Sequence, residues 1–141
     1  MRQKMLLSGA LAVVFGVSGV VHLVAPGVYR PIMPQWLPAP LALIYISGVC
    51  ELLGALGLLA PRVAPVRGLT RYGLVALLFA VFPANVQMAF NGFTQGASPL
   101  ALSLEVARLP LQWVLIMAVL AATEAPRLPH SATPAQPTVN G

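Results

Sequence analysis

The sequence predicts an all-α membrane protein built as a bundle of four transmembrane helices, and three observations support this. Of the 141 residues, 58% are hydrophobic and only 8% are charged, which leaves too few polar side chains to cover a water-soluble domain. Four apolar segments are each long enough to cross a bilayer, which takes about 20 residues. Stretches rich in proline, glycine or arginine separate these segments.

The first expected helix covers residues 5–24 and follows a short basic run that contains Arg2 and Lys4. A basic run before an apolar core is typical of a signal peptide. Here the apolar run is long enough to span, and no small-x-small cleavage motif precedes Pro26, so we expect the helix to be retained. His22 lies near its far end, either at the wet interface or in a polar site.

The second expected helix, residues 41–60, carries one carboxylate at its middle, Glu51. A charged side chain at the bilayer centre costs roughly 2.5 to 3.5 kcal/mol, so Glu51 should face the protein interior and be paired, hydrogen-bonded or protonated. Small residues that permit close helix approach share its sector of about 120°: Ser47, Gly48, Gly54 and Ala55. We therefore expect this face to point into the bundle.

The connecting loops predict the topology. Residues 26–40 contain five prolines and should form a loop at the membrane surface, acting either as a lid over the bundle or as a plain anchor. Arginines at 62, 67 and 71 gather in the second loop without an acid, whereas residues 90–100 carry no charge. By the positive-inside rule, both termini and the second loop should be cytoplasmic.

The third and fourth helices are expected at residues 69–89 and 103–122. Pro83 should kink the third helix by removing a bond to the carbonyl of Phe79, and Asn85 lies close to that opening.

In the fourth helix, Glu105, Arg108 and Gln112 fall on one face because their spacings are three and four. Residues 125–141 have too few large apolar side chains to pack, so we expect a disordered cytoplasmic tail after a transmembrane domain of residues 1–124.

Five polar residues from all four helices fall in the outer half of this topology. They are the candidate ligand-binding residues His22, Glu51, Asn85, Arg108 and Gln112. We expect them to meet in one polar site, since each is costly in lipid. Glu51 and Arg108 are the expected ion pair, although Arg108 could pair with Glu105 and leave Glu51 protonated. Three roles stay open: holding helix register, binding a ligand, and carrying a proton on Glu51.

The composition also argues against several functions. The net charge of +5 comes from scattered basic residues, which we interpret as topology signals and not as a nucleic-acid surface. One cysteine excludes an intramolecular disulfide, and His22 is the only histidine in a membrane segment, so one subunit lacks two axial haem ligands. We expect no metal site. A transporter is less favoured, because no internal repeat is evident.

Five segments in order between Ser8 and Trp113 resemble the DoxX family of small four-helix bacterial membrane proteins: SGVVHLVAPGVY, MPQWLPAP, SGVCELLGALGLLAPR, FPANVQMA and RLPLQW. The resemblance implies a multi-pass protein of the bacterial inner membrane whose polar positions are the five candidate residues. Relatives in that family include subunits linked to thiosulfate oxidation with quinone as acceptor, and others associated with oxidative-stress defence.

Two function classes follow. The first is a binding or accessory subunit, in a homodimer or a membrane redox complex, that holds a quinone or a lipid-like ligand in the outer half of the bundle. The second is a quinone-linked oxidoreductase component in which Arg108 or His22 contacts a quinone oxygen and Glu51 passes a proton. A partner protein would then have to supply the electrons, so we do not expect an autonomous enzyme. The sequence identifies no catalytic residues.

Overall fold

The computed structural model describes residues 2–60 and 63–125. Four long helices make up most of this part of the chain: α1 (Arg2–Val24), α2 (Pro40–Leu59), α3 (Ala64–Thr94) and α4 (Pro99–Ala122). Each is long and apolar enough to cross a membrane. The prediction of an all-helical, multi-pass membrane protein with four spanning helices is thereby confirmed.

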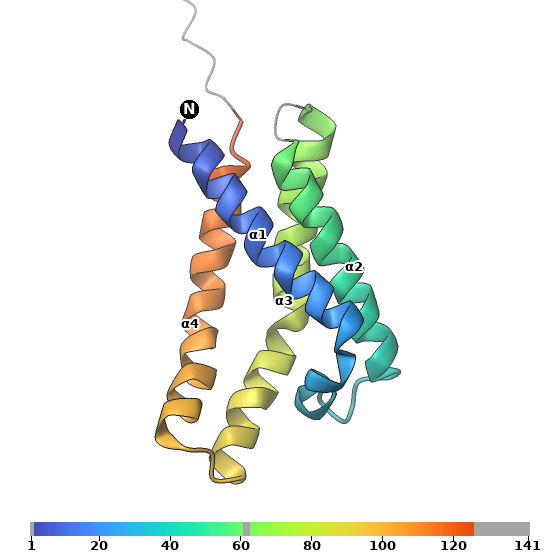
Figure 1. Cartoon of the computed structure of the whole chain (residues 1–141), viewed down its shortest axis with the longest axis vertical. Helices are drawn as coiled ribbons and strands as arrows, with labels where there is room; N and C mark the ends of the chain where they lie inside the picture. The colour runs from blue at the N-terminus through green and yellow to red at the C-terminus, as the bar shows by residue number, and fades with distance from the viewer. Residues whose placement is uncertain (1, 61–62, 126–141) are drawn as a thin grey trace, which may run out of the picture.

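The helices run alternately up and down, with each packed against its neighbours in sequence and α1 also against α4 (Figure 1). The N-terminus, the α2–α3 connection and the end of α4 lie at one end of the bundle, which we call the terminal end. The α1–α2 and α3–α4 connections lie at the opposite end, which we call the loop end. The even number of spans places both ends of the described chain on one side.

The two C-terminal helices are longer than the sequence predicts. Helix α3 extends the expected 69–89 by about a turn at each end, and α4 begins at Pro99 instead of residue 103. The expected loop of residues 90–100 therefore shrinks to residues 95–98. The start of α4 has a local cause, because Ser98 caps the helix by accepting a hydrogen bond from the Ala101 amide, 3.3 Å long. Pro99 then occupies a first-turn position, which needs no amide donor.

The proline-rich connection between α1 and α2 contains two short 3₁₀ turns, η1 (Pro26–Val28) and η2 (Arg30–Ile32). It is irregular, as its prolines predict. The connection also contacts the bundle, because η2 packs against α3. The Asn91 side-chain amide donates a 2.9 Å hydrogen bond to the Pro31 carbonyl. The connection therefore reaches across the loop end to the last turns of α3.

The terminal half of the bundle holds a continuous apolar core to which all four helices contribute. Its buried members are Leu11, Ala12, Phe15, Ala55, Leu58, Leu74, Leu78, Ile116, Val119 and Ala122. Gly54 lets the Leu74 side chain lie directly against α2, because a Cβ at position 54 would overlap it. Arg71 closes this half by donating a 3.1 Å hydrogen bond to the Leu120 carbonyl.

Two sequence predictions concern residues outside the described part. The expected cytoplasmic tail falls there except for Ala125, and so does Arg62, one of the three arginines of the second loop.

Candidate functional site

The candidate site begins where α1 and α2 cross at two glycines. A Cβ added to Gly19 would lie 2.8 Å from the Gly48 carbonyl oxygen, and one added to Gly48 would lie 2.7 Å from the Cβ of His22. Both distances are too short for any side chain. The crossing therefore needs glycine on both helices, and it brings the two backbones into contact.

His22 and Glu51 meet at this crossing because each lies three residues after one of the glycines. Helical side chains lean toward the N-terminus of their own helix. Since α1 and α2 are antiparallel, His22 and Glu51 lean toward each other. The Glu51 Oε2 lies 3.4 Å from the His22 Nδ1, and both residues are buried, with 7% and 9% of their surfaces exposed. Two polar groups from two helices thus share one buried space.

The tautomer of His22 follows from its backbone contact. Its Nδ1 lies 2.9 Å from the Ser18 carbonyl oxygen, which can only accept a hydrogen bond, so Nδ1 carries a proton. In the neutral ring, Nε2 is then an acceptor. The ring stacks on Tyr29, with centroids 3.7 Å apart and planes 15° apart. The His22 ring is therefore held on two sides, by the Ser18 carbonyl and by the Tyr29 ring.

Glu51 keeps an unsatisfied oxygen. Its Oε2 is buried and makes no hydrogen bond within the described chain, while Ser18 is a hydrogen-bonding neighbour of both Glu51 and Tyr29. The cluster of Ser18, His22, Tyr29 and Glu51 is called the α1–α2 polar cluster below. A buried acceptor without a partner costs roughly 1 to 3 kcal/mol, so burying this oxygen alone lowers the stability of the bundle.

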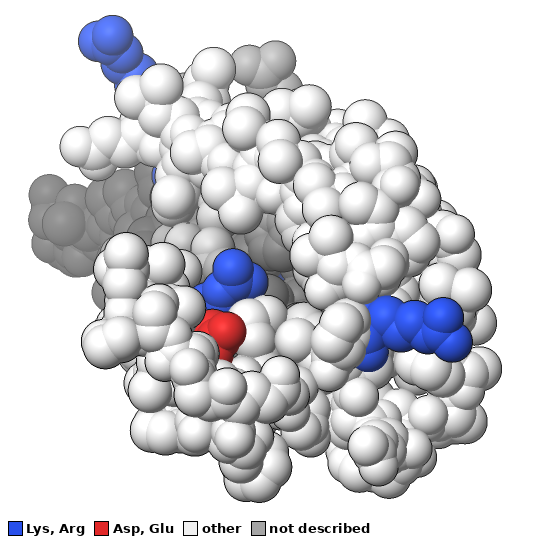
Figure 2. Space-filling model, turned by 60° about the horizontal axis from the view of Figure 1, so that its bottom comes forward, with Lys and Arg blue, Asp and Glu red and all other residues white. Residues whose placement is uncertain are grey.

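Arg108 on α4 acts on the α1–α2 polar cluster at a distance. Burial raises the pKa of the Tyr29 hydroxyl above its ordinary 10.0, and the Glu51 carboxylate raises it further. A hydrogen bond with Ser18 and the positive charge of Arg108 partly offset this. The guanidinium is therefore close enough to influence Tyr29 electrostatically. Figure 2 shows the loop end, where acidic and basic side chains are visible together in a hollow of an otherwise largely uncharged surface.

The expected ion pair between Glu51 and Arg108 does not form among the residues described. Glu51 faces His22 instead, because the glycine crossing turns its side chain toward α1. The alternative pair of Arg108 with Glu105 is also not made, and the Arg108 side chain is exposed. The sequence places these charges at suitable depths, but the helix pairing decides which of them meet.

Asn85 and Gln112 form a separate polar link between α3 and α4. The Asn85 amide donates a 2.7 Å hydrogen bond to the Gln112 side-chain oxygen, and the buried Gln112 amide donates to the Leu78 carbonyl. The sequence suggested that Asn85 could bond to the Phe79 carbonyl, which Pro83 leaves without its helical hydrogen bond. The structure instead shows Gln112 bonded to the carbonyl of the preceding residue, Leu78. These contacts join the two helices beside the proline.

The structure thus divides the five predicted site residues. His22 and Glu51 are brought together, and Asn85 and Gln112 form a second pair. Arg108, on the loop-end half of α4, makes no ion pair with any residue that the structure describes. Sequence reasoning missed Ser18, and it treated Tyr29 only as part of the expected membrane-surface loop of residues 26–40. The spacing of four between Ser18 and His22 puts them on one helix face and was a usable signal. Within the described ranges, no three His, Cys, Asp or Glu side chains group in a way that could hold a metal ion.

Comparison with known proteins gives one result. Searches of curated proteins and of solved structures gave no match. A family model described as a domain of unknown function, DUF8561, matches residues 11–123, which contain both crossing glycines, the whole α1–α2 polar cluster and Arg108. The chain therefore belongs to the DUF8561 family.

Proposed function

We propose that this protein is a membrane-embedded binding or accessory subunit that holds the polar head of a quinone, or of a lipid-like amphiphile, at the α1–α2 polar cluster. The observation that carries the proposal is the buried Oε2 of Glu51, which lacks a hydrogen-bond partner beside a stacked histidine. A ligand hydroxyl would satisfy that oxygen and remove the cost of burying it alone.

The available groups suit both redox forms of a quinone. Glu51 Oε2 and the Nε2 of neutral His22 accept hydrogen bonds, as a quinol hydroxyl requires. The Arg108 guanidinium has no ion pair in the described chain and can donate to a quinone carbonyl. Apolar helix surfaces around the polar cluster suit an isoprenoid or acyl tail. The resemblance to the DoxX family supports the same ligand class.

A second candidate function is a quinone-linked oxidoreductase component, of the thiosulfate-oxidation or oxidative-stress type. The proton on Nδ1 favours it, because it leaves Nε2 free to exchange a proton with a quinone oxygen while Glu51 stabilises the charged imidazole. A partner protein would supply the two electrons, and solvent would supply the two protons, that convert a quinone into a quinol.

The ligand proposal is tested by the quinones and lipids that co-purify with the protein in native lipid particles, identified by mass spectrometry. Wild type is compared with Glu51→Gln and Arg108→Gln. The matched controls are Glu124→Gln, at the terminal end, and Arg30→Gln, in η2. We expect the two site variants to retain at least tenfold less of one compound, while the two controls match wild type. Equal ligand content in all five proteins, or none in any, contradicts the proposal.

The proposal extends to orientation: both termini lie in the cytoplasm of a bacterium, and the loop end faces the outer side of the membrane. It extends also to assembly, as a homodimer or as part of a membrane redox complex. Its support is the arginine pair Arg67 and Arg71 near the terminal end, together with the basic start of α1. Reporter fusions at Gly96 and after Ala125 test it. An outward signal from Gly96 and a cytoplasmic signal after Ala125 are expected, and the reverse pattern refutes it.

A further inference from the structure

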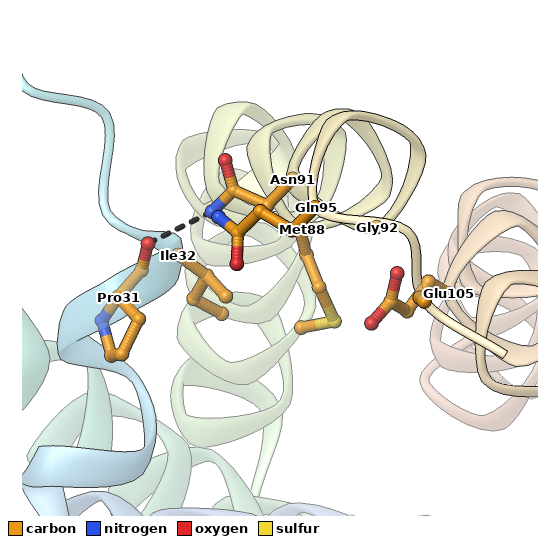
Figure 3. A pocket seen from close by; sticks show the side chains of 8 residues that line it. Pro31, Ile32, Met88, Asn91, Gly92, Gln95 and Glu105 are labelled. Carbon is orange, nitrogen blue, oxygen red and sulfur yellow. Dashed lines mark hydrogen bonds between the residues drawn. The ribbon is translucent and has the colours of Figure 1, made fainter.

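A second polar space lies at the loop end, outside the α1–α2 polar cluster. It is a cavity of about 300 Å³ between η2, the last turns of α3 and the α4 face that carries Glu105 (Figure 3). This volume is at the small end of the range for ligand cavities. It suits a small polar molecule or a lipid headgroup. The proposed quinone site does not use these side chains.

One wall of the cavity is fixed by hydrogen bonds within the chain. Asn91 donates from its side-chain amide to the Pro31 carbonyl over 2.9 Å, and its side-chain oxygen accepts a 2.8 Å hydrogen bond from Gln87. Figure 3 shows the first of these bonds closing the gap between η2 and α3. Because both polar groups of Asn91 are already used, this wall is built without a ligand.

Glu105 forms the opposite wall and is not satisfied. Its carboxylate projects from α4 across the cavity toward α3, near Met88 (Figure 3). The Oε2 atom is buried and has no hydrogen-bond partner in the part of the chain that the structure describes. Gly92 makes room for it, since a Cβ at position 92 would overlap this oxygen. The Oε2 atom is thus covered by α3 but lacks a donor, while the Glu105 side chain as a whole is half-buried.

The surroundings of Glu105 favour a cationic donor. The cavity is lined by the C-terminal turn of α3, where the helix macrodipole places partial negative charge. Arg108, one turn further along α4, makes no ion pair with Glu105. A buried carboxylate gains most from a charged N–H donor, because charge-assisted hydrogen bonds are about twice as strong as neutral ones.

We propose that this cavity binds an ammonium group that keeps at least one N–H bond, such as a protonated primary amine, with the N–H donating to Glu105. The ammonium could belong to the headgroup of an aminophospholipid or to a small free amine such as ethanolamine. A quaternary ammonium carries no N–H group, so it should bind poorly. This inference is independent of the quinone proposal, since neither His22 nor Glu51 takes part.

The first test uses the wild-type protein and does not depend on a variant folding. Native mass spectrometry of the detergent-purified protein measures the affinity for phosphatidylethanolamine, its mono- and dimethyl derivatives and phosphatidylcholine, all with the same acyl chains. We expect phosphatidylcholine to bind at least tenfold more weakly than the lipids that keep an N–H group. Ethanolamine and choline are compared in parallel by thermal shift. A preference for ethanolamine without a preference among the lipids identifies a free amine as the ligand.

The second test assigns the preference to Glu105. Glu105→Gln keeps the shape of the side chain and removes its charge, whereas Glu124→Gln removes a carboxylate at the terminal end. We expect the amine preference to fall at least tenfold in the first variant and to persist in the second, with the quinone content unchanged in both. The proposal is overturned if wild type prefers neither phosphatidylethanolamine nor ethanolamine, or if the preference survives in Glu105→Gln.

Discussion

The two halves of the bundle use their buried space differently. The terminal half packs side chains such as Leu58, Leu74 and Val119 into a continuous apolar core. From the middle of the bundle to the loop end, the buried polar side chains are an imidazole, a carboxyl and an amide, those of His22, Glu51 and Gln112. In the terminal half, the buried polar side chains are hydroxyls, those of Ser8, Thr70 and Thr123. Both buried side-chain oxygens that lack hydrogen-bond partners in the described chain, on Glu51 and Glu105, are directed toward this region.

This difference concerns stability. A group that is buried without a partner lowers stability, so a protein that only needed to fold would gain by replacing it with an apolar side chain. The terminal half follows that logic and the loop half does not. The apolar core of the terminal half therefore stabilises the bundle, while both unpartnered oxygens, on which the two proposals rest, belong to the loop half.

The largest expected effect on stability comes from truncating one side chain in the apolar core. Leu58 is 1% exposed, whereas its neighbour Leu59 is 64% exposed on the outer face of α2. Leu58→Ala should lower the free energy of unfolding in detergent by about 2 to 5 kcal/mol because it leaves a cavity. Leu59→Ala should change it by less than about 0.5 kcal/mol. Ligand content per folded molecule should stay constant in both. Similar losses for the two variants would mean that the core is not where the structure places it.

A smaller loss is expected at the glycine crossing, which joins the two halves. Gly19→Ala places a Cβ against the Gly48 carbonyl and the Leu52 side chain, so it should cost about 1 to 3 kcal/mol. It should also reduce ligand binding, because α1 and α2 move apart next to His22. Gly9→Ala on the same helix meets nothing within 4 Å and should be neutral or stabilising by about 0.5 to 1 kcal/mol. Thermal unfolding of both variants tests this prediction. If Gly9→Ala is also destabilised, the loss in Gly19→Ala cannot be assigned to the helix crossing.

The coupling inside the polar cluster is expected to be smaller still. In a double-mutant cycle of unfolding free energies, Glu51→Gln and His22→Phe should couple by about 0.5 to 2 kcal/mol, since their atoms lie 3.4 Å apart. The phenylalanine ring preserves stacking on Tyr29. Glu51→Gln with Arg108→Gln should couple by less than about 0.5 kcal/mol, because this pair is not in contact. A stronger coupling to Arg108 than to His22 would restore the ion pair that the sequence alone suggests.

The spanning segments could be predicted because the bilayer imposes a length and an apolar composition on each of them. The C-terminal extension of α3 could not, since Asn91 there contacts the first loop, which is a tertiary feature. The earlier start of α4 has a local signal, Ser98 followed by Pro99, but hydropathy does not register it.

The sequence singles out two residues of the α1–α2 polar cluster, but it does not predict that they contact each other. A histidine or a carboxylate is costly in lipid and therefore rare in a membrane segment, so the sequence alone singles out His22 and Glu51 as candidate site residues. Which partner each one meets depends on the rotation of α1 against α2, and that is set by the contact between Gly19 and Gly48. From the sequence, Glu105 was recognised as a member of a helix face and as an alternative partner of Arg108, but its cavity could not be predicted because η2 and α3 form it together.

The smallest effect concerns the titration of Tyr29, which reports the charges of the loop half. Its pKa lies above 10.0, chiefly through burial and then through Glu51, so the stability gained by keeping it neutral is present below pH 10 and is lost as pH rises through the folded-state pKa. The difference in tyrosinate absorbance between wild type and Tyr29→Phe isolates this residue. Glu51→Gln should lower its pKa and Arg108→Gln should raise it, because the first removes a negative charge and the second a positive one. If neither variant moves the titration, Arg108 does not face the α1–α2 polar cluster, and a ligand there cannot bridge α4 to α1.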